Sequence, residues 1–361
     1  MSRKIQRRGL FSKKKTNKPG FRVWLHTLLS VVAIFYGVIF LWPVVPATGN
    51  VADSPVYKVK IKPQSSLASI AEQLQEQGIS SSTIPFQFSA LALFVGSKLK
   101  PGTYLLPTRA SMGKILLQIA RGDRVRESIA IIPGMTIWQL RKLVDAHPAL
   151  IHQTKRMSSK ELVHTLNLNY SSDEGIFLPD TYIFDPDEPD INIYRRASQA
   201  MQKQLAQTWV QKEEGSPLKT AYELLILASI VEKETGRSSD RGLVAAVFTN
   251  RLNKGMLLQT DPTVIYGIGP KFDGNIRKAD LRKDSPYNTY MRKGLPPTPI
   301  AMPSKESIQA AIRPASSNAL YFVAKGDGTS HFSHSLGEHE AAVDRYQRKL
   351  TPKTSSGTAA N

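Results

Sequence analysis

The longest run of apolar residues in the chain lies near its N-terminus. Residues 28–45, LLSVVAIFYGVIFLWPVV, carry no charged side chain, and about eighteen such residues approach the length that crosses a bilayer as a helix. Trp24 and Trp42 stand near its two ends, where aromatic side chains favour the membrane interface. The pattern predicts one transmembrane helix over residues 24–46.

A cleaved signal peptide is the alternative interpretation, because Val45-Pro46-Ala47 is an acceptable cleavage site. The apolar segment is longer than the core of a usual signal peptide, and the basic region before it is long, so the pattern favours an uncleaved anchor. Nine basic residues and no acidic residue precede the run. By the positive-inside rule, residues 1–23 are then a basic cytoplasmic tail, and the rest of the chain lies outside the cytoplasm.

Alternating apolar residues followed by helically spaced ones occur three times after this segment, within residues 56–78, 102–122 and 127–145. Each stretch predicts a strand, a turn and an amphipathic helix. Whether the three are related copies or independent units stays open. The first resembles the LysM carbohydrate-binding module in its short strand and its helix with Ile70-Ala71, although its turn, Lys62 to Leu67, lacks the usual Gly-Asp pair. Glycan binding by this unit is therefore only suggested.

The second half of the chain shows mainly helical spacing, interrupted by turn-rich stretches. The pattern predicts a short strand around Pro179 and a hairpin whose turn is residues 325–329. It predicts helices over residues 148–166, 191–214, 217–235, 241–253 and 305–311.

Charge and composition exclude several classes of function. The net charge is +19, and subtracting the nine basic residues of the tail leaves +10 for the remainder. Such a surface suits a polyanion such as nucleic acid, anionic lipid or a charged wall polymer. Nucleic acid is excluded as a partner by the predicted location outside the cytoplasm. The chain has no cysteine, which excludes disulfides, thiolate catalysis and cysteine-based zinc sites.

Two carboxylates, Glu232 and Glu234, end the apolar stretch that begins at Leu224. Residues two apart on a helix point about 200° apart, so they cannot act as the facing pair of an ordinary glycosidase. Glu234 lies three residues after Val231 and seven after Leu227, and so extends an apolar stripe. Desolvation there would raise its pKa, as a general acid requires. The alternative is that both are solvated charges at a helix end.

Amide, carboxylate and phenol side chains gather in the loop-rich sequence that follows. Planar hydrogen-bonding groups and aromatic faces are typical of sugar-binding clefts, but such residues also favour turns that bind nothing. The candidate substrate-binding residues are Gln259, Asp261, Tyr266, Tyr287, Asn288 and Tyr290.

Three histidines, His331, His334 and His339, lie near the C-terminus. A metal site needs imidazoles that converge on one point, and one strand with a following loop does not supply that geometry. We expect them to be surface or substrate-contacting residues, and we expect no metal.

Several segments, in this order, resemble the YceG-like family of endolytic murein transglycosylases. They are "EGIFLPDTY" (174–182), "LASIVEKET" (227–235), "VFTNRLNKGMLLQTDPTVIYG" (247–267), "YNTYMRKGLPPTPIAMPS" (287–304) and "ALYFVAKGDGTSHFS" (319–333). The resemblance covers residues 24 to about 345. It implies an α+β protein with a transmembrane helix over 24–46, a LysM-like α/β subdomain over 54–130, and a lysozyme-like, mainly helical catalytic domain with a β-hairpin insertion over 131–348. The polar and small residues at the C-terminus predict a flexible tail over 349–361.

The resemblance also implies the activity. Such an enzyme is a lyase of the cell inner membrane whose periplasmic domain cuts the β-1,4 bond between N-acetylmuramic acid and N-acetylglucosamine in nascent glycan strands, leaving a 1,6-anhydro end. The essential acid of the family falls on Glu234. Analogy with soluble lytic transglycosylases, which carry a Glu, a Gln-containing turn and a Tyr-Asn motif, assigns substrate positioning to Gln259 and Asn288. The chemistry requires no cofactor, and the family suggests penicillin-binding peptidoglycan synthases as partners.

Two other functions are compatible with the pattern. A non-catalytic peptidoglycan-binding membrane protein would grip glycan without a proton donor. A hydrolase of the same bond would need a second carboxylate, such as Asp261, to activate water.

Overall fold

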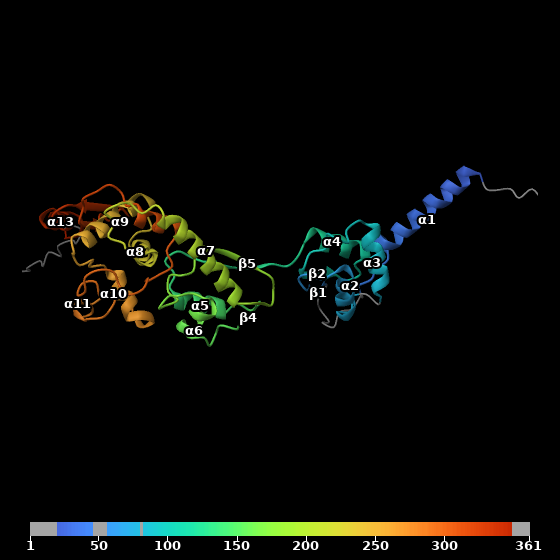
Figure 1. Ribbon diagram of the computed structural model, residues 1–361, viewed down its shortest axis with the longest axis horizontal. Helices are drawn as coiled ribbons and strands as arrows, with labels where there is room; N and C mark the ends of the chain where they lie inside the picture. Colours follow the sequence, from blue (N-terminus) through green and yellow to red (C-terminus); the bar gives the residue numbers. More distant parts are fainter. Residues whose placement is uncertain (1–19, 46–55, 80–81, 349–361) are drawn as a thin grey trace, which may run out of the picture. The chain divides into compact units, whose positions relative to one another are not determined.

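The computed structural model describes residues 20–45, 56–79 and 82–348 of the chain (Figure 1). Most of the expected basic tail, Pro46-Ala47 of the candidate cleavage site, and the expected flexible tail over 349–361 lie outside the described residues. The chain divides into two compact units, residues 1–125 and 126–361. Each unit has a hydrophobic core of its own.

The first unit pairs two strands and packs helices on them. β1 and β2 are antiparallel, in a register that runs from Val56 opposite Pro107 to Ile61 opposite Gly102. Tyr104 on β2 is fully buried, and its hydroxyl donates to the carbonyl of Lys100. The elements are α1 (Phe21–Leu41), β1 (Val56–Ile61), α2 (Leu67–Glu76), α3 (Thr83–Ala92), β2 (Gly102–Pro107) and α4 (Met112–Arg121).

The apolar helix α1 has 21 residues and a mean hydropathy of 2.1 over its most apolar window. By length and composition it could cross a membrane, and nearly all of its surface is exposed. Its last two turns touch the rest of the unit, where Ile39 is buried against α4.

Over its described residues, 126–348, the second unit is mainly helical, with three two-stranded sheets. β3 pairs with β5 and β7 with β8, both antiparallel, whereas β4 and β6 are parallel. Its elements are β3 (Glu127–Ile131), α5 (Ile137–Asp145), β4 (Leu150–Ile151), α6 (Ser159–Thr165), β5 (Asp180–Phe184), β6 (Glu188–Pro189), α7 (Ile191–Trp209), α8 (Ala221–Glu234), α9 (Ser238–Asn253), α10 (Asp261–Ile268), η1 (Gly269–Lys271), α11 (Lys278–Arg282), α12 (Lys305–Ile312), β7 (Tyr321–Ala324), β8 (Ser330–Ser333), α13 (Leu336–Val343) and the π-helical turn η2 (Asp344–Arg348).

Helix α8 is the centre of this unit. Every residue from Leu224 to Val231 is buried, which is why the segment is apolar on all sides rather than on one stripe. It contacts α7, α9, α10 and α12. Figure 1 shows α8 between the labelled helices α9 and α10. The one polar residue of this stretch, Ser229, donates to the carbonyl of Ile226 and accepts from the backbone N–H of Ile300, so its hydroxyl is satisfied without water.

One predicted helix is wrong in its extent. Residues 148–166 contain the strand β4 and only a short helix, α6. A reciprocal capping box between Ser158 and Glu161 starts α6, and the buried carboxylate of Asp190 accepts from the backbone N–H groups of Gln153 and Thr154. These bonds hold the preceding segment in an extended and turned path.

Candidate active site

The two carboxylates at the end of α8 lie in different surroundings. One oxygen of Glu232 accepts from the backbone N–H of Ser304 at 2.8 Å and from the Ser307 hydroxyl at 2.7 Å. Ser304 is the N-cap of α12, where a negative charge is favourable. Glu232 therefore joins α8 to α12. Its carboxylate has a structural role, because these hydrogen bonds hold it at the start of α12.

Glu234 is the last residue of α8 and points into a cavity of about 500 Å³. Its Oε1 accepts a short hydrogen bond from the hydroxyl of Thr260. Burial raises the pKa of the Glu234 carboxyl, and the nearby Asp261 adds to the rise, whereas the Thr260 hydrogen bond and Arg251 oppose it. The net direction is upward, which favours a protonated acid at higher pH than an exposed glutamate would allow.

The cavity combines an apolar wall with a polar one. Its described lining comprises Glu234, Phe248, Arg251, Leu258, Gln259, Asp261, Tyr290, Tyr321, Phe322, Val323, Ala324, Leu336, His339, Val343 and Gln347. Aromatic and aliphatic surface beside a few hydrogen-bonding groups is typical of a site that binds a sugar.

A turn between α9 and α10 carries two of the polar lining residues. Gln259 has a φ of 50°, a left-handed conformation that costs a non-glycine residue energy and that often occurs at functional sites. Its backbone N–H donates to the carbonyl of Thr289, and the N–H of Thr260 donates to the Thr289 hydroxyl. Asp261 begins α10 and accepts from the Tyr290 phenol at 2.6 Å. The turn is thus fixed to the loop that contains Tyr290.

Four of the seven candidate residues, Glu234, Gln259, Asp261 and Tyr290, line this one cavity. Tyr266 and Tyr287 are not among its lining residues. Their rings meet edge to face with centroids 4.9 Å apart, and Tyr266 also stacks on Trp138. Both rings pack against the main core of the unit.

Asn288 is buried, and both the nitrogen and the oxygen of its side-chain amide are hydrogen-bonded to the backbone. Nδ2 donates to the carbonyls of Asp280, Leu281 and Lys283, and Oδ1 accepts from the backbone N–H of Tyr290. In this geometry Asn288 holds the loop that presents Tyr290 to the cavity. Asn288 itself is not among the lining residues of the cavity.

Arg251 is a lining residue that the sequence pattern did not single out. This buried guanidinium donates to the carbonyls of Leu320 and Leu258, and it lies 5.0 Å from the centroid of the Tyr321 ring. Its positive charge favours the ionised form of Glu234. A buried arginine inside helix α9 has no local sequence signal, because its carbonyl partners lie in later segments.

His339 is the one residue of the C-terminal histidines that lines the cavity. Its ring stacks on Tyr321 with centroids 5.2 Å apart, and its buried Nδ1 has no hydrogen-bond partner within the described part of the chain. Burial lowers the pKa of the imidazole, and Arg251 lowers it further.

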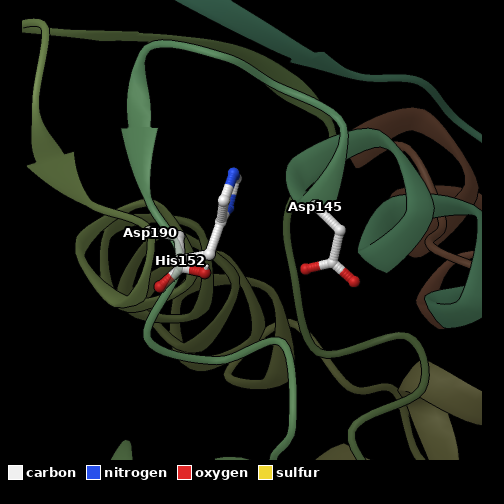
Figure 2. Close-up of side chains that lie close together, drawn as sticks. All are labelled: Asp145, His152 and Asp190. Atoms are coloured by element: carbon white, nitrogen blue, oxygen red, sulfur yellow. Dashed lines mark ion pairs between the residues drawn. The ribbon is translucent and has the colours of Figure 1, made fainter.

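One group in the described segments has the spacing of a metal site, and it lies away from this cavity. Asp145, His152 and Asp190 offer ligand atoms within 4.8 Å of one another (Figure 2). The Asp190 carboxylate is already used, because it accepts from two backbone N–H groups and from the hydroxyl of Thr154 at 2.8 Å. The buried Asp190 carboxylate therefore has a structural role: it fixes the backbone between β4 and α6.

Comparisons with known proteins agree on one family. A family model described as the YceG-like family matches residues 59–345. The endolytic murein transglycosylase of Bacillus subtilis (strain 168) is 36% identical over 193 residues, which cover 54% of this chain and 51% of that protein. The endolytic murein transglycosylase of Streptococcus pneumoniae serotype 2 is 36% identical over 176 residues, which cover 47% of this chain and 31% of that protein. The chain thus spans about half or less of the length of these relatives.

A solved structure is similar as well. The 2.6 Å crystal structure of a yceG-like protein from Listeria monocytogenes matches with a TM-score of 0.52 and 30% sequence identity. The match covers 79% of this chain and 98% of the Listeria chain.

Proposed function

The chain belongs to the YceG-like family, and from that membership and the cavity around Glu234 we propose that it is an endolytic peptidoglycan lytic transglycosylase. The proposed reaction cleaves the β-1,4 bond between N-acetylmuramic acid and N-acetylglucosamine in nascent strands and leaves a 1,6-anhydro end. The observation that supports it most is one carboxyl, Glu234, with a raised pKa at the wall of a polar and aromatic cavity.

A single carboxyl suffices for this chemistry. Protonated Glu234 gives its proton to the glycosidic oxygen as the bond to C1 breaks, and positive charge develops at C1. The carboxylate that remains takes the proton of the C6 hydroxyl while that oxygen bonds to C1. The ring closes, Glu234 is protonated again, and no water is consumed.

The other cavity groups have roles that fit this cycle. Thr260 bonds the Glu234 carboxyl and fixes its orientation. Arg251 stabilises the carboxylate formed in mid-reaction, because its buried positive charge favours that form. We assign substrate binding to Gln259, Asp261 and Tyr290, which share the cavity with the acid.

A hydrolase is the second candidate, because Asp261 lies in the same cavity as Glu234. It would use Asp261 to activate water. The Tyr290 phenol already donates to that carboxylate at 2.6 Å, so one of its oxygens is occupied and is not available to take a proton from water. The lyase therefore fits the cavity better.

The arrangement in the membrane is part of the proposal. We assign α1 as a single-pass anchor in the cell inner membrane, with a cytoplasmic N-terminus and a periplasmic catalytic unit. The first unit, in which β1, a turn and α2 follow one another with Ile70 and Ala71 buried, would be the LysM-like part, and the second the lysozyme-like part. Penicillin-binding synthases remain the partners proposed from the family.

Glu234→Gln tests the assignment of the acid. The amide keeps the shape of the carboxyl and can still accept from Thr260, but it has no acidic proton to donate. We expect the variant to bind purified glycan strands as the wild-type chain does and to lose at least about 10³-fold in turnover. Glu232→Gln is a control for the neighbouring carboxylate. Substantial turnover by the Glu234→Gln protein would refute the assignment.

A further inference from the structure

Helix α3 presents an apolar face that the first unit leaves uncovered. Ile84, Phe88 and Leu91 are 63%, 65% and 62% exposed, and their spacing of four and three residues places them on one side of the helix. The opposite side buries Phe86 and Ala90 in the core of the unit. A helix that is apolar on both sides is expected to contact a second apolar surface besides the core of its own unit.

The turn after α3 adds an exposed aromatic ring. Phe94 has a φ of 55° and is 82% exposed, and the N–H of Val95 donates to the carbonyl of Ala90. This is the αL position after a helix, where glycine is favoured because it has no side chain to strain. The packing within the unit does not require a phenyl group at this position.

Residues 79–97, which include α3, carry no charged side chain, and Lys98 and Lys100 follow directly. An uncharged apolar segment followed by an exposed lysine, Lys98, suits the boundary between acyl chains and headgroups, where that lysine can reach the phosphates. The Lys100 ammonium already donates to the carbonyl of Arg121.

Contacts within the unit hold this face beside α1. The hydroxyl of Tyr36 on α1 donates to the carbonyl of Ala92, the last residue of α3, at 3.0 Å. Phe40 and Ile39 pack over Gly113 of α4, and the N–H of Val44 donates to the carbonyl of Ala110. These contacts fix the position of α3 along the axis of α1, close to the C-terminal end of that helix.

If α1 spans the membrane, its length determines the depth at which α3 lies. Its 21 residues span about 31 Å, close to the thickness of the hydrocarbon core. Tyr36 lies five residues before Leu41, the end of the helix, so it lies about 8 Å inside that end. The C-terminal end of α3, which Tyr36 contacts, then lies at a similar depth, within the roughly 5–10 Å to which an interfacial helix buries its apolar face.

We propose that α3 is a membrane-docking helix, which inserts Ile84, Phe88, Leu91 and Phe94 into the leaflet at the C-terminal end of α1. The inference rests on the proposed membrane-spanning role of α1. A lipid occupant is favoured over a protein because the face is continuous, through Tyr36 and Ala92, with the exposed apolar surface of α1. Docking would hold the first unit against the bilayer.

The absence of native cysteine allows a direct test. Single-cysteine variants of the full chain, Phe88→Cys and Leu91→Cys, are labelled with NBD and reconstituted in vesicles of phosphatidylethanolamine and phosphatidylglycerol. Glu72→Cys, at an exposed position of α2, is the aqueous control, and Val31→Cys, in the middle of α1, reports the membrane span. Quenching by doxyl-labelled lipid is then measured for each label.

The proposal expects the labels on α3 to emit at shorter wavelength than the label at position 72, and to be quenched by shallow doxyl lipid about twofold more or better. Quenching on α3 no greater than at position 72, with the label at position 31 quenched, would overturn the docking of α3 while leaving the anchor intact. An unquenched label at position 31 would overturn the anchor and the docking together, and glycan cleavage would still report on the lyase.

Phe94→Gly separates docking from folding. Glycine suits the αL backbone, so we expect the melting temperature to stay the same or rise, while quenching of a label at position 88 falls. An unchanged quenching pattern would exclude Phe94 from the docking surface.

Discussion

Glu232 and Glu234 lie two positions apart on α8, and the helix turns their side chains to different sides. Glu232 is bound by Ser304 and Ser307 at the start of α12, whereas Glu234 reaches the cavity with Thr260 as its hydrogen-bond donor. One apolar helix thus positions one structural carboxylate and one candidate acid.

Thr260→Val should move the pH profile of glycan cleavage. The Thr260 hydrogen bond lowers the pKa of Glu234, so its removal raises that pKa and keeps the acid protonated to higher pH. We expect the alkaline limb of kcat/KM to move to higher pH.

Thr249→Val is the matched control, because the buried Thr249 hydroxyl has no partner among the residues described. It should leave the limb in place. An unmoved or downward-shifted limb in the Thr260→Val protein would contradict the role given to this hydrogen bond.

Glu174 should make stability depend on pH. Burial raises the pKa of this fully buried carboxyl to about 8, although the N–H of Ile137 opposes the rise. Between about pH 4.5 and 8 the folded chain keeps a proton that the unfolded chain has lost, so stability falls as pH rises through this window.

Glu174→Gln should flatten that dependence, since the amide has no proton to lose. The measurement is the melting temperature of the detergent-solubilised chain from pH 5 to 9. An equally steep decline in the variant would show that Glu174 does not titrate in this range.

The role of a single residue could be predicted where it depends on residues nearby in the sequence, and not where it depends on distant segments. Helical phase singled out Glu234 because it depends only on neighbouring positions. The sequence could not show that Tyr266 stacks on Trp138, that Tyr287 meets the ring of Tyr266, or that Asn288 binds backbone carbonyls, because those partners depend on how the loops fold together. Arg251 gave no signal for the same reason.

At the scale of elements, the apolar pattern predicts the long helices well. The helix expected over 217–235 is α8, Ala221–Glu234, and the one expected over 241–253 is α9, Ser238–Asn253. The prediction over 148–166 fails because hydrogen bonds from Asp190 and the capping box at Ser158 outweigh the local helical spacing. Local pattern also did not identify α3, whose apolar residues lie on both of its sides.

The loop before β5 is fixed by a glycine. Gly175 has a φ of 76°, and a Cβ there would lie 2.4 Å from the Cβ of Pro299. Gly175→Ala should therefore lower the free energy of unfolding by about 3 kcal/mol, from backbone strain together with steric overlap.

Gly215→Ala is the matched control, since Gly215 has a φ of 82° with open space around it. It should cost only about 1 kcal/mol, for the αL backbone alone. Chemical denaturation of the two variants measures the difference, and equal losses would contradict the close packing at Gly175.

At the scale of the whole molecule, the chain combines an apolar N-terminal helix with two compact units. Of the three strand–turn–helix patterns, the first two supply β1 and β2, which pair with each other, whereas the third supplies β3, which pairs with β5 in the second unit. The spacing of apolar residues identifies each strand–turn–helix segment. It does not specify which strands pair, because pairing depends on contacts between distant segments.

Mass spectrometry of the products tests the central claim most directly. Purified peptidoglycan is digested with the detergent-solubilised full chain and, in parallel, with the Glu234→Gln variant. The account predicts muropeptides with 1,6-anhydro ends, each one water lighter than a hydrolysis product, from the wild-type chain and none from the variant. Reducing ends from the wild-type chain would contradict the lyase and indicate a hydrolase that uses Asp261.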